Sequence, residues 1–453
     1  MLRFILRHKI LCLLLVLLVG IAYFAATKWN IWFHNPSEVA YTAPVKPTWI
    51  LLTLGNEGEQ SRNVSWMCGD EVRPSFVELV DTASDDTLKV AAEGEMFASR
   101  SGKAAYYHAK LNALNPASHY FYRVKTGDMV SEWYDFTTYE AQRDRFSFVY
   151  VGDVQDTIGG QSGEMLKEAL RRNPESEFLL CGGDLVERPA YQYWEETFRD
   201  IDSIAQHVPV MNITGNHDYL KNVICTLERR FPLIFSYFLE SNVDDNMVYT
   251  TTYANTQFFF LDSNREFLYL PAQRSWLEEQ LKSSTAKWKI VVVHHPLYSI
   301  KGNNQIQRWF FNGLVQQYGV DLVLQGHEHA YARRTMKDAD GKMTTPVYTV
   351  SHCSPKNYLI KFDDAFDKFG ISSRYYQTVD IKGDTMALAT YEVYSNTLYD
   401  SLNIVKTSTS TKIDDFGKNI KENMSYRVNP KSCKSRKYQQ RIDEYKKRHP
   451  ERM

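Results

Sequence analysis

Cysteine is scarce in this chain, with six residues among 453, and no two of them have the spacing of a metal-binding pair. One lies in an apolar stretch near the N-terminus, which leaves five for the rest of the chain. A disulfide among those five is compatible with the sequence, but the sequence does not select its partners. An excess of either charge is also lacking, because 53 basic residues oppose 54 acidic ones. Nothing in the overall charge therefore points to a nucleic-acid partner.

Long apolar runs are lacking too, except for residues 10–26, which carry no charge. Basic and titratable residues flank this run, namely Arg3, Arg7, His8 and Lys9 before it and Lys28 after it. At about 1.5 Å per residue, the run nearly crosses a hydrocarbon core of about 30 Å, helped by an interfacial Trp29. The basic flank places the N-terminus in the cytoplasm and the remainder outside. We interpret residues 1–29 as an uncleaved signal anchor.

A cleaved signal peptide is the alternative interpretation of residues 1–29. Cleavage needs a small-x-small arrangement, and residues 22–26 offer no clean example. A buried core helix fits a basic and then apolar N-terminus poorly. We therefore expect the part of the chain after residue 29 to be exported. It is periplasmic or on the cell surface if the segment stays attached, and secreted if the segment is removed.

Residues 47–140 follow a proline-bearing linker, residues 30–46, and consist of short predicted strands separated by turn residues. Regular short strands over about 90 residues favour a β-sandwich. The Leu-x-Pro-x-x-x-Tyr spacing of Leu114, Pro116 and Tyr120 resembles the tyrosine corner of fibronectin type III domains. We expect a domain of that type here, without a catalytic constellation.

Residues 141–406 show a different pattern, in which apolar strand-like runs alternate with helical segments. The runs are residues 146–151, 178–181, 208–213, 258–261, 290–293 and 320–324, and polar residues follow each of them. In open α/β sheets, ligands bind outside the carboxyl ends of the strands, so these polar residues can converge on one crevice. The pattern predicts a layered α/β domain with helices covering the sheets.

Seven of these polar residues are candidates for one site: Asp153, Asp184, Asn216, His217, His294, His327 and His329. Five of the twelve histidines fall at just three strand ends. Carboxylate, amide and imidazole groups form a donor set suited to Zn, Mn or Fe, without thiolate. Two such ions about 3.5–4 Å apart can clamp an in-line displacement at phosphorus, and Asp184 is the natural shared ligand.

The order of the motifs resembles the calcineurin-like metallophosphoesterase superfamily. The motifs are Gly152-Asp153, Gly183-Asp184, Gly215-Asn216-His217-Asp218, His294 with Pro296, and Gly326-His327-Glu328-His329. The fibronectin-like domain and the Gly-His-x-His-Ala-Tyr ending resemble the purple acid phosphatase branch. This resemblance covers roughly residues 47–406. It implies a four-layer αββα core and phosphoester hydrolysis by a dinuclear centre.

The resemblance also assigns roles to individual residues. It implies that Asp153 and His329 bind one ion, that Asn216, His294 and His327 bind the other, and that Asp184 bridges them. His217 resembles the residue that contacts the substrate and protonates the leaving group. An imidazole titrates near neutrality, and Asp218 could orient it and raise its pKa. We expect two divalent or mixed-valence ions from among Fe, Zn and Mn.

Glu187 departs from the purple acid phosphatase pattern, in which a tyrosine that binds ferric iron occupies this position. Residues 183–188 instead resemble the Gly-Asp-x-Val-Asp-Arg motif of the serine/threonine phosphatase branch. There the acid orients the catalytic histidine and the arginine grips phosphate. Arg188 is therefore a candidate phosphate contact, with a surface salt bridge as the alternative. Glu187 could instead ligate a metal ion.

Two further residues extend the predicted site. Gln155 follows the first aspartate by two residues, and its amide oxygen could complete a coordination shell. His295 fits the lining of the substrate pocket better than a ligand position. Residues 298–308 contain no histidine, so the substrate-gripping histidines of plant-type members have no counterpart there.

We predict a hydrolase of phosphate monoesters acting on a small phosphoester and held to a membrane by its N-terminal helix. The alternative is a phosphodiesterase using the same site, for example on nucleotide or lipid-headgroup diesters. A more remote alternative is a surface binding module that no longer catalyses. Residues 407–453 are polar and basic, and we expect a partly disordered or weakly helical, solvated tail. The sequence does not determine the oligomeric state.

Overall fold

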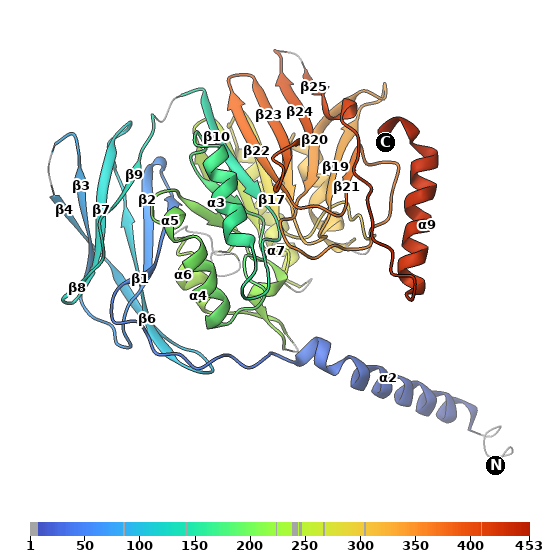
Figure 1. The fold of residues 1–453 in the computed structure, drawn as a ribbon, viewed down its shortest axis with the longest axis horizontal. Coiled ribbons are helices and arrows are strands. Elements are labelled where there is room, and N and C mark those ends of the chain that lie inside the picture. The colour runs from blue at the N-terminus through green and yellow to red at the C-terminus, as the bar shows by residue number, and fades with distance from the viewer. Residues whose placement is uncertain are drawn as a thin grey trace.

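The computed structural model describes residues 8–453, apart from 85–86, 141–142, 223, 238–242, 244–246, 266–267, 303–304 and 409. One long helix, α2 (Lys9–Phe33), projects from the rest of the molecule in Figure 1. Its segment from Lys9 to Trp29 is long and apolar enough to cross a membrane, and none of it is buried. A signal sequence would show the same length and composition.

Two antiparallel sheets form the domain that follows. One has the order β1 (Thr48–Gly55), β2 (Gly58–Met67), β6 (Lys103–Leu111), β5 (Glu93–Ala98). The other has the order β4 (Thr87–Ala91), β3 (Ser75–Asp81), β7 (His119–Thr126), β8 (Met129–Val130), with β9 (Tyr134–Thr137) also paired to β7. Trp66 and Tyr122 lie in the core between them. The Tyr120 hydroxyl accepts a 2.7 Å hydrogen bond from the backbone N of Asn115, which confirms the predicted tyrosine corner.

Two seven-stranded sheets form the second domain. The first has the order β12 (Val210–Asn212), β11 (Leu179–Cys181), β10 (Arg145–Val151), β22 (Tyr375–Lys382), β23 (Thr385–Glu392), β24 (Leu398–Lys406), β25 (Thr411–Asp415). The second has the order β15 (Tyr249–Tyr253), β16 (Thr256–Leu261), β17 (Trp288–Val293), β18 (Leu322–Gln325), β20 (Met343–Val350), β19 (Tyr331–Lys337), β21 (Lys368–Gly370).

Side-chain alternation along the strands divides the core of this domain. On β16, Phe258 and Phe260 belong to the cluster shared with the first sheet, whereas Phe259 and Leu261 belong to a cluster on the other face. The outer faces carry helices, with α3 (Ser162–Arg172), α4 (Tyr191–Asp200) and α5 (Asp202–Ala205) on one side and α7 (Leu270–Ser283) and α8 (Gly313–Gln317) on the other. The predicted four-layer αββα architecture is thereby confirmed.

The two domains meet through aromatic packing. Trp49 on β1 stacks on Phe198 of α4 with ring centroids 5.2 Å apart, and its Nε1 donates a 2.9 Å hydrogen bond to Glu195. The Tyr122 hydroxyl donates to the carbonyl of Gln206 at 2.8 Å. Because these contacts are buried or half-buried, the sandwich is part of the same packed body as the second domain.

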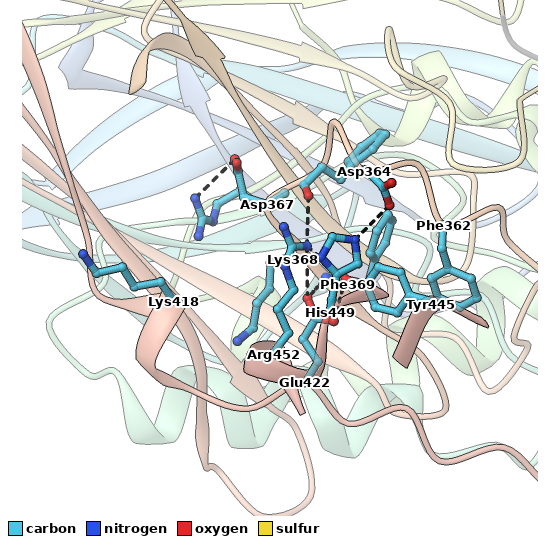
Figure 2. A network of polar contacts seen from close by, with 12 residues as sticks. Phe362, Asp364, Asp367, Lys368, Phe369, Lys418, Glu422, Tyr445, His449 and Arg452 are labelled. Atoms are coloured by element: carbon cyan, nitrogen blue, oxygen red, sulfur yellow. Dashed lines mark hydrogen bonds and ion pairs between the residues drawn. The ribbon is translucent and has the colours of Figure 1, made fainter. Parts of the chain in front are cut away.

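The prediction of a partly disordered or weakly helical, solvated tail at residues 407–453 is wrong. These residues form strand β25 (Thr411–Asp415) and a docked helix, α9 (Cys433–Arg448). Tyr438, Ile442 and Tyr445 lie on one face of α9 and are buried against the second sheet. Figure 2 shows the surrounding contacts, in which Tyr445 donates to Glu422 at 2.8 Å and lies 4.8 Å from the Phe362 ring. Apolar residues at i, i+4 and i+7 bury this face although the helix is otherwise highly charged.

Cys68, Cys181, Cys225, Cys353 and Cys433 are all free, so no disulfide forms within the described residues. Cys181 ends β11 and is fully buried. Burial raises the pKa of its thiol, in keeping with the predicted role as a small apolar residue.

Candidate metal centre

The loops that carry the candidate residues leave aligned strand ends. In the first sheet, Val151, Cys181 and Asn212 are register partners at the ends of three parallel strands. In the second sheet, Val293 and Gln325 are partners in the same way. Because the two sheets pack face to face, the loops after these five positions meet at one edge of the domain.

Three predicted ligands surround one point at this edge. Asp184, His294 and His327 offer ligand atoms that all lie within 4.8 Å of one another. His294 Nε2 lies 3.3 Å from Asp184 Oδ2 and 3.3 Å from Asn216 Oδ1, and His327 Nδ1 lies 2.8 Å from the same Asn216 oxygen. His294 Nδ1 lies 2.8 Å from the Gly182 carbonyl, which accepts its proton. Nε2 is therefore the nitrogen that presents a lone pair to the site.

Asp153 and His329 form the second half of the cluster. His329 Nε2 lies 3.5 Å from Asp153 Oδ1, and the backbone N of His327 donates to Asp153 Oδ2. Among the described residues, buried Asp153 Oδ1 and His329 Nδ1 have no hydrogen-bond partner. Unsatisfied buried polar atoms are rare in native proteins, and a bound cation can satisfy such an oxygen. The donor set therefore fits a metal ion on this side too.

The backbone of the ligand loops is strained. Asp153, Asp184, His327 and His329 have φ values of 45°, 53°, 70° and 38°. Left-handed backbone at a residue other than glycine costs on the order of 1–3 kcal/mol and concentrates at functional sites. Gly215 lies so close to Asp184 that a Cβ there would meet Asp184 Oδ1 at 2.0 Å. The loops are thus held in an unfavourable conformation that brings the ligands together.

Burial and mutual charge shift the pKa values of these groups. Although burial opposes it, the charges of His294 and His217 lower the pKa of Asp184 below its usual range. Burial raises the pKa of Asp153 well above its ordinary value. Burial lowers the pKa of His329 to about 3 and that of His327 well below its ordinary value. Both imidazoles are therefore neutral near pH 7, which is the form that binds metal ions.

His217 lies beside the cluster, half-buried on a short 3₁₀ turn, η1 (Asn216–Asp218). Its backbone N donates a 2.8 Å hydrogen bond to Asp184 Oδ1. Its ring Nδ1 lies 2.5 Å from the backbone carbonyl of Glu187. Asp218 instead accepts a 2.8 Å hydrogen bond from the backbone N of Gly215. The Glu187 carbonyl is thus a hydrogen-bond partner of the His217 ring.

The Glu187 carboxylate pairs with Lys356. Tyr358, two residues further on, packs its ring 4.3 Å from the His329 ring. Burial raises the pKa of Tyr358 to about 12. Sequence reasoning missed Lys356 and Tyr358, because they lie in an irregular loop without a motif. Their proximity depends on how that loop crosses the strand ends.

The remaining predicted residues surround the ligands. Gln155 is buried, and its backbone N donates to the Asp184 carbonyl at 3.0 Å. The His295 ring lies 4.1 Å from the His327 ring, and its Nδ1 lies 3.0 Å from Ser263 Oγ. Burial lowers the pKa of His295 to about 3. His295 thus packs against the ligand His327 and contacts Ser263.

A cavity of about 230 Å³ opens beside His217 and Asn216. Arg188, predicted as a phosphate contact, lines this cavity, as does Lys221. The linker residues 34–37, which follow α2, also contribute to its wall. Nothing in the sequence indicated that the linker would reach the site.

Comparison with known families gives two matches. Residues 146–331 match the calcineurin-like phosphoesterase family, and residues 47–138 match the N-terminal domain of purple acid phosphatases. The matched segments together make up more than half of the chain. Both boundaries agree with the change of pattern near residue 140.

The curated relatives are plant phosphatases. The phosphoenolpyruvate phosphatase of Allium cepa is 24% identical over 310 residues, which are 63% of this chain and 63% of that protein. Purple acid phosphatase 18 of Arabidopsis thaliana is 25% identical over 336 residues, 70% of this chain and 71% of that protein. The Fe(3+)-Zn(2+) purple acid phosphatase 12 of the same plant is 22% identical over 311 residues, 64% of this chain and 65% of that protein. The chain spans a little under two thirds of the onion protein.

Solved structures show the same fold. Purple acid phosphatase PPD1 from yellow lupin (Lupinus luteus) seeds aligns with a TM-score of 0.70 at 19% identity, over 82% of this chain and 76% of that one. PhoD aligns with a TM-score of 0.58 at 12% identity, over 92% of this chain and all of that one. Residues 146–331 therefore form a domain of the calcineurin-like phosphoesterase family, residues 47–138 form a purple acid phosphatase N-terminal domain, and the curated relatives above are plant phosphatases.

Proposed function

We propose that this protein is a phosphomonoesterase with a dinuclear metal centre. The observation that carries the proposal is the convergence of six ligand-type side chains from five loops, with Asp184 at the centre of the contacts. Asp153 and His329 would hold one ion, Asn216, His294 and His327 the other, and Asp184 both. Such a pair activates water and neutralises charge on the phosphoryl oxygens.

The chain's own residues would bind the substrate and supply the proton. Arg188 lines the cavity beside His217 and can bind phosphate oxygens through its planar guanidinium. With Nδ1 of His217 held by the Glu187 carbonyl, Nε2 is the ring nitrogen that would protonate the leaving-group oxygen. The Glu187 carboxylate is paired with Lys356, so Glu187 would act on His217 through its backbone carbonyl.

The test is hydrolysis of an aryl phosphate by the full-length protein and by Asp184→Asn, with metal content measured in both. Loss of one shared carboxylate should lower metal content and reduce kcat by two or more orders of magnitude. Asp128→Asn is the matched control, because Asp128 lies exposed in the turn between β7 and β8. Full activity in Asp184→Asn, or in the wild type after chelation, would refute the proposal. Faster hydrolysis of a bis-aryl phosphate would favour the diesterase alternative.

A further inference from the structure

Part of the wall of the cavity beside His217 comes from the linker that follows the apolar helix α2. Residues 34–37 line it together with Arg188 and Lys221. This wall begins one residue after the last residue of α2, Phe33. The place where a leaving group would lie is therefore built in part by the segment that leaves the apolar helix.

The linker is fixed to the catalytic domain by specific contacts. Asn35 donates to the Lys221 carbonyl at 2.7 Å and accepts from the Lys221 backbone N at 2.8 Å. Arg100 donates to the Pro36 carbonyl at 2.7 Å. Glu38 pairs with Arg230, and their side chains are 1% and 0% exposed. Because removing one partner of a buried pair is strongly destabilising, this attachment is firm and the linker is not a loose tether.

The firm linker fixes the height of the cavity above a membrane. The apolar span ends at Trp29, and the helix continues unbroken to Phe33. Five residues of helical rise from Trp29 to His34 amount to about 8 Å. With Trp29 at the interface, as tryptophan prefers, the cavity lies at the level of the lipid headgroups or just above them. Figure 1 shows α2 projecting away from the packed domains.

Charge at the cavity suits an anionic surface. Arg100, Arg188 and Lys221 line it, and the one acidic lining residue, Glu187, is already paired with Lys356. Basic residues near an anionic leaflet attract a protein to the membrane surface. The same charges would hold a phosphate group that projects from the bilayer.

We propose that the substrate is a phosphate monoester carried by a lipid of the membrane in which α2 is anchored. This inference rests on the proposed phosphomonoesterase function and on α2 remaining attached. Water would add to phosphorus and the bond from phosphorus to the lipid oxygen would break. The lipid alcohol would take its proton from His217 and stay in the bilayer, while inorganic phosphate is released. Residues 34–37 would position the headgroup.

The experiment uses the full-length protein reconstituted in phosphatidylcholine vesicles that contain phosphatidic acid. Phosphate release from this lipid is compared with hydrolysis of an aryl phosphate and of a water-soluble, short-chain phosphatidic acid. In one variant, a flexible Gly/Ser segment is inserted between Phe33 and His34, which leaves the linker contacts intact but releases the cavity from the surface. We expect this insertion to lower kcat/KM for bilayer phosphatidic acid on the order of tenfold and to leave both soluble substrates unchanged.

The matched control carries the same insertion in the exposed turn at 338–341, far along the chain from the cavity, and should behave as wild type on all three substrates. Aryl phosphate hydrolysis without release from bilayer phosphatidic acid would overturn the inference and leave the proposed function standing. An insertion variant as active on the bilayer as wild type would also overturn it. A mass spectrum showing that the membrane-associated protein begins after Trp29, and so lacks the apolar helix, would overturn the inference as well. Failure on every substrate would instead refute the proposed function.

Discussion

At the scale of single residues, Glu187 makes two contacts beside the ligand cluster. Its carboxylate pairs with Lys356, while its backbone carbonyl holds the ring of His217. The Glu187 carboxylate therefore has a cationic partner of its own, Lys356. Tyr358 packs on His329, and it belongs to the loop that also carries Lys356.

His217→Ala should separate leaving-group protonation from metal binding. Loss of a general acid should reduce kcat for alkyl phosphates by about 10²–10⁴, and much less for a nitrophenyl phosphate, whose leaving group needs no proton. The measurement is kcat for a series of leaving groups of increasing pKa, with metal content determined in parallel. His108→Ala is the matched control, since His108 lies on β6 of the sandwich domain. An equal loss across the series would mean that His217 is not the acid.

At the scale of elements, the loops after parallel strands carry the site, and the short segment between β14 (Thr226–Leu227) and α6 (Arg230–Ile234) braces the linker beside it. Glu228 is 5% exposed and accepts a 2.9 Å hydrogen bond from the backbone N of Arg230. Arg230 also pairs with Glu38 of the linker. Arg230 Nη1 also lies 3.4 Å from Glu228 Oε1, so two carboxylates share one buried guanidinium.

Burial raises the pKa of Glu228 from 4.5 to about 7, although Arg230 opposes the shift. The folded protein therefore holds this proton where the unfolded chain has lost it, and stability should fall as pH rises from about 4.5 to about 7. The loss attributable to Glu228 is on the order of 3 kcal/mol. Glu228→Gln should flatten this part of the profile, as measured by urea unfolding across the window. Glu132→Gln, at an exposed turn, should leave it unchanged. A steep profile in Glu228→Gln would contradict the assignment.

At the scale of the whole molecule, the sandwich and the catalytic domain form one packed body joined by Trp49. Its indole is 5% exposed and stacks on Phe198 and Tyr191, with centroids 5.2 Å away in both cases. The linker passes the same place, where Tyr41 stacks on Tyr191 at 3.8 Å. The linker that forms part of the cavity wall therefore also packs at the junction between the two domains.

Trp49→Ala should destabilise the protein by about 3–5 kcal/mol, because it leaves a large cavity at the junction. We also expect a single calorimetric transition of the wild type to split into two in the variant, as the domains lose their coupling. Trp309→Ala is the matched control, since Trp309 is 84% exposed. An unsplit transition with a small shift in Tm would show that other contacts hold the domains together.

Much of the site could be predicted from the sequence because the candidate metal-binding residues come directly after apolar runs that form strands. Asp153, Asp184 and His294 each come within three residues of a strand end, and parallel strands align those ends whatever else the chain does. The tyrosine corner could also be predicted, because its hydrogen bond joins Asn115 and Tyr120, which are close in sequence. Helix α9 was missed because its charged composition masked a narrow apolar face at Tyr438, Ile442 and Tyr445.

The sequence by itself determined the alternation of strands and helices, the ligand types and the position of the apolar helix, because each follows from local periodicity or from residues adjacent to a strand. Only the tertiary structure decided what the irregular segments do. Glu187 pairs with Lys356 across 169 residues, and Asn35 bonds Lys221 across 186. Contacts of that separation leave no periodic signal, because they depend on how loops cross a finished sheet. They are the contacts that shape the cavity beside His217 and bring the linker after α2 to it.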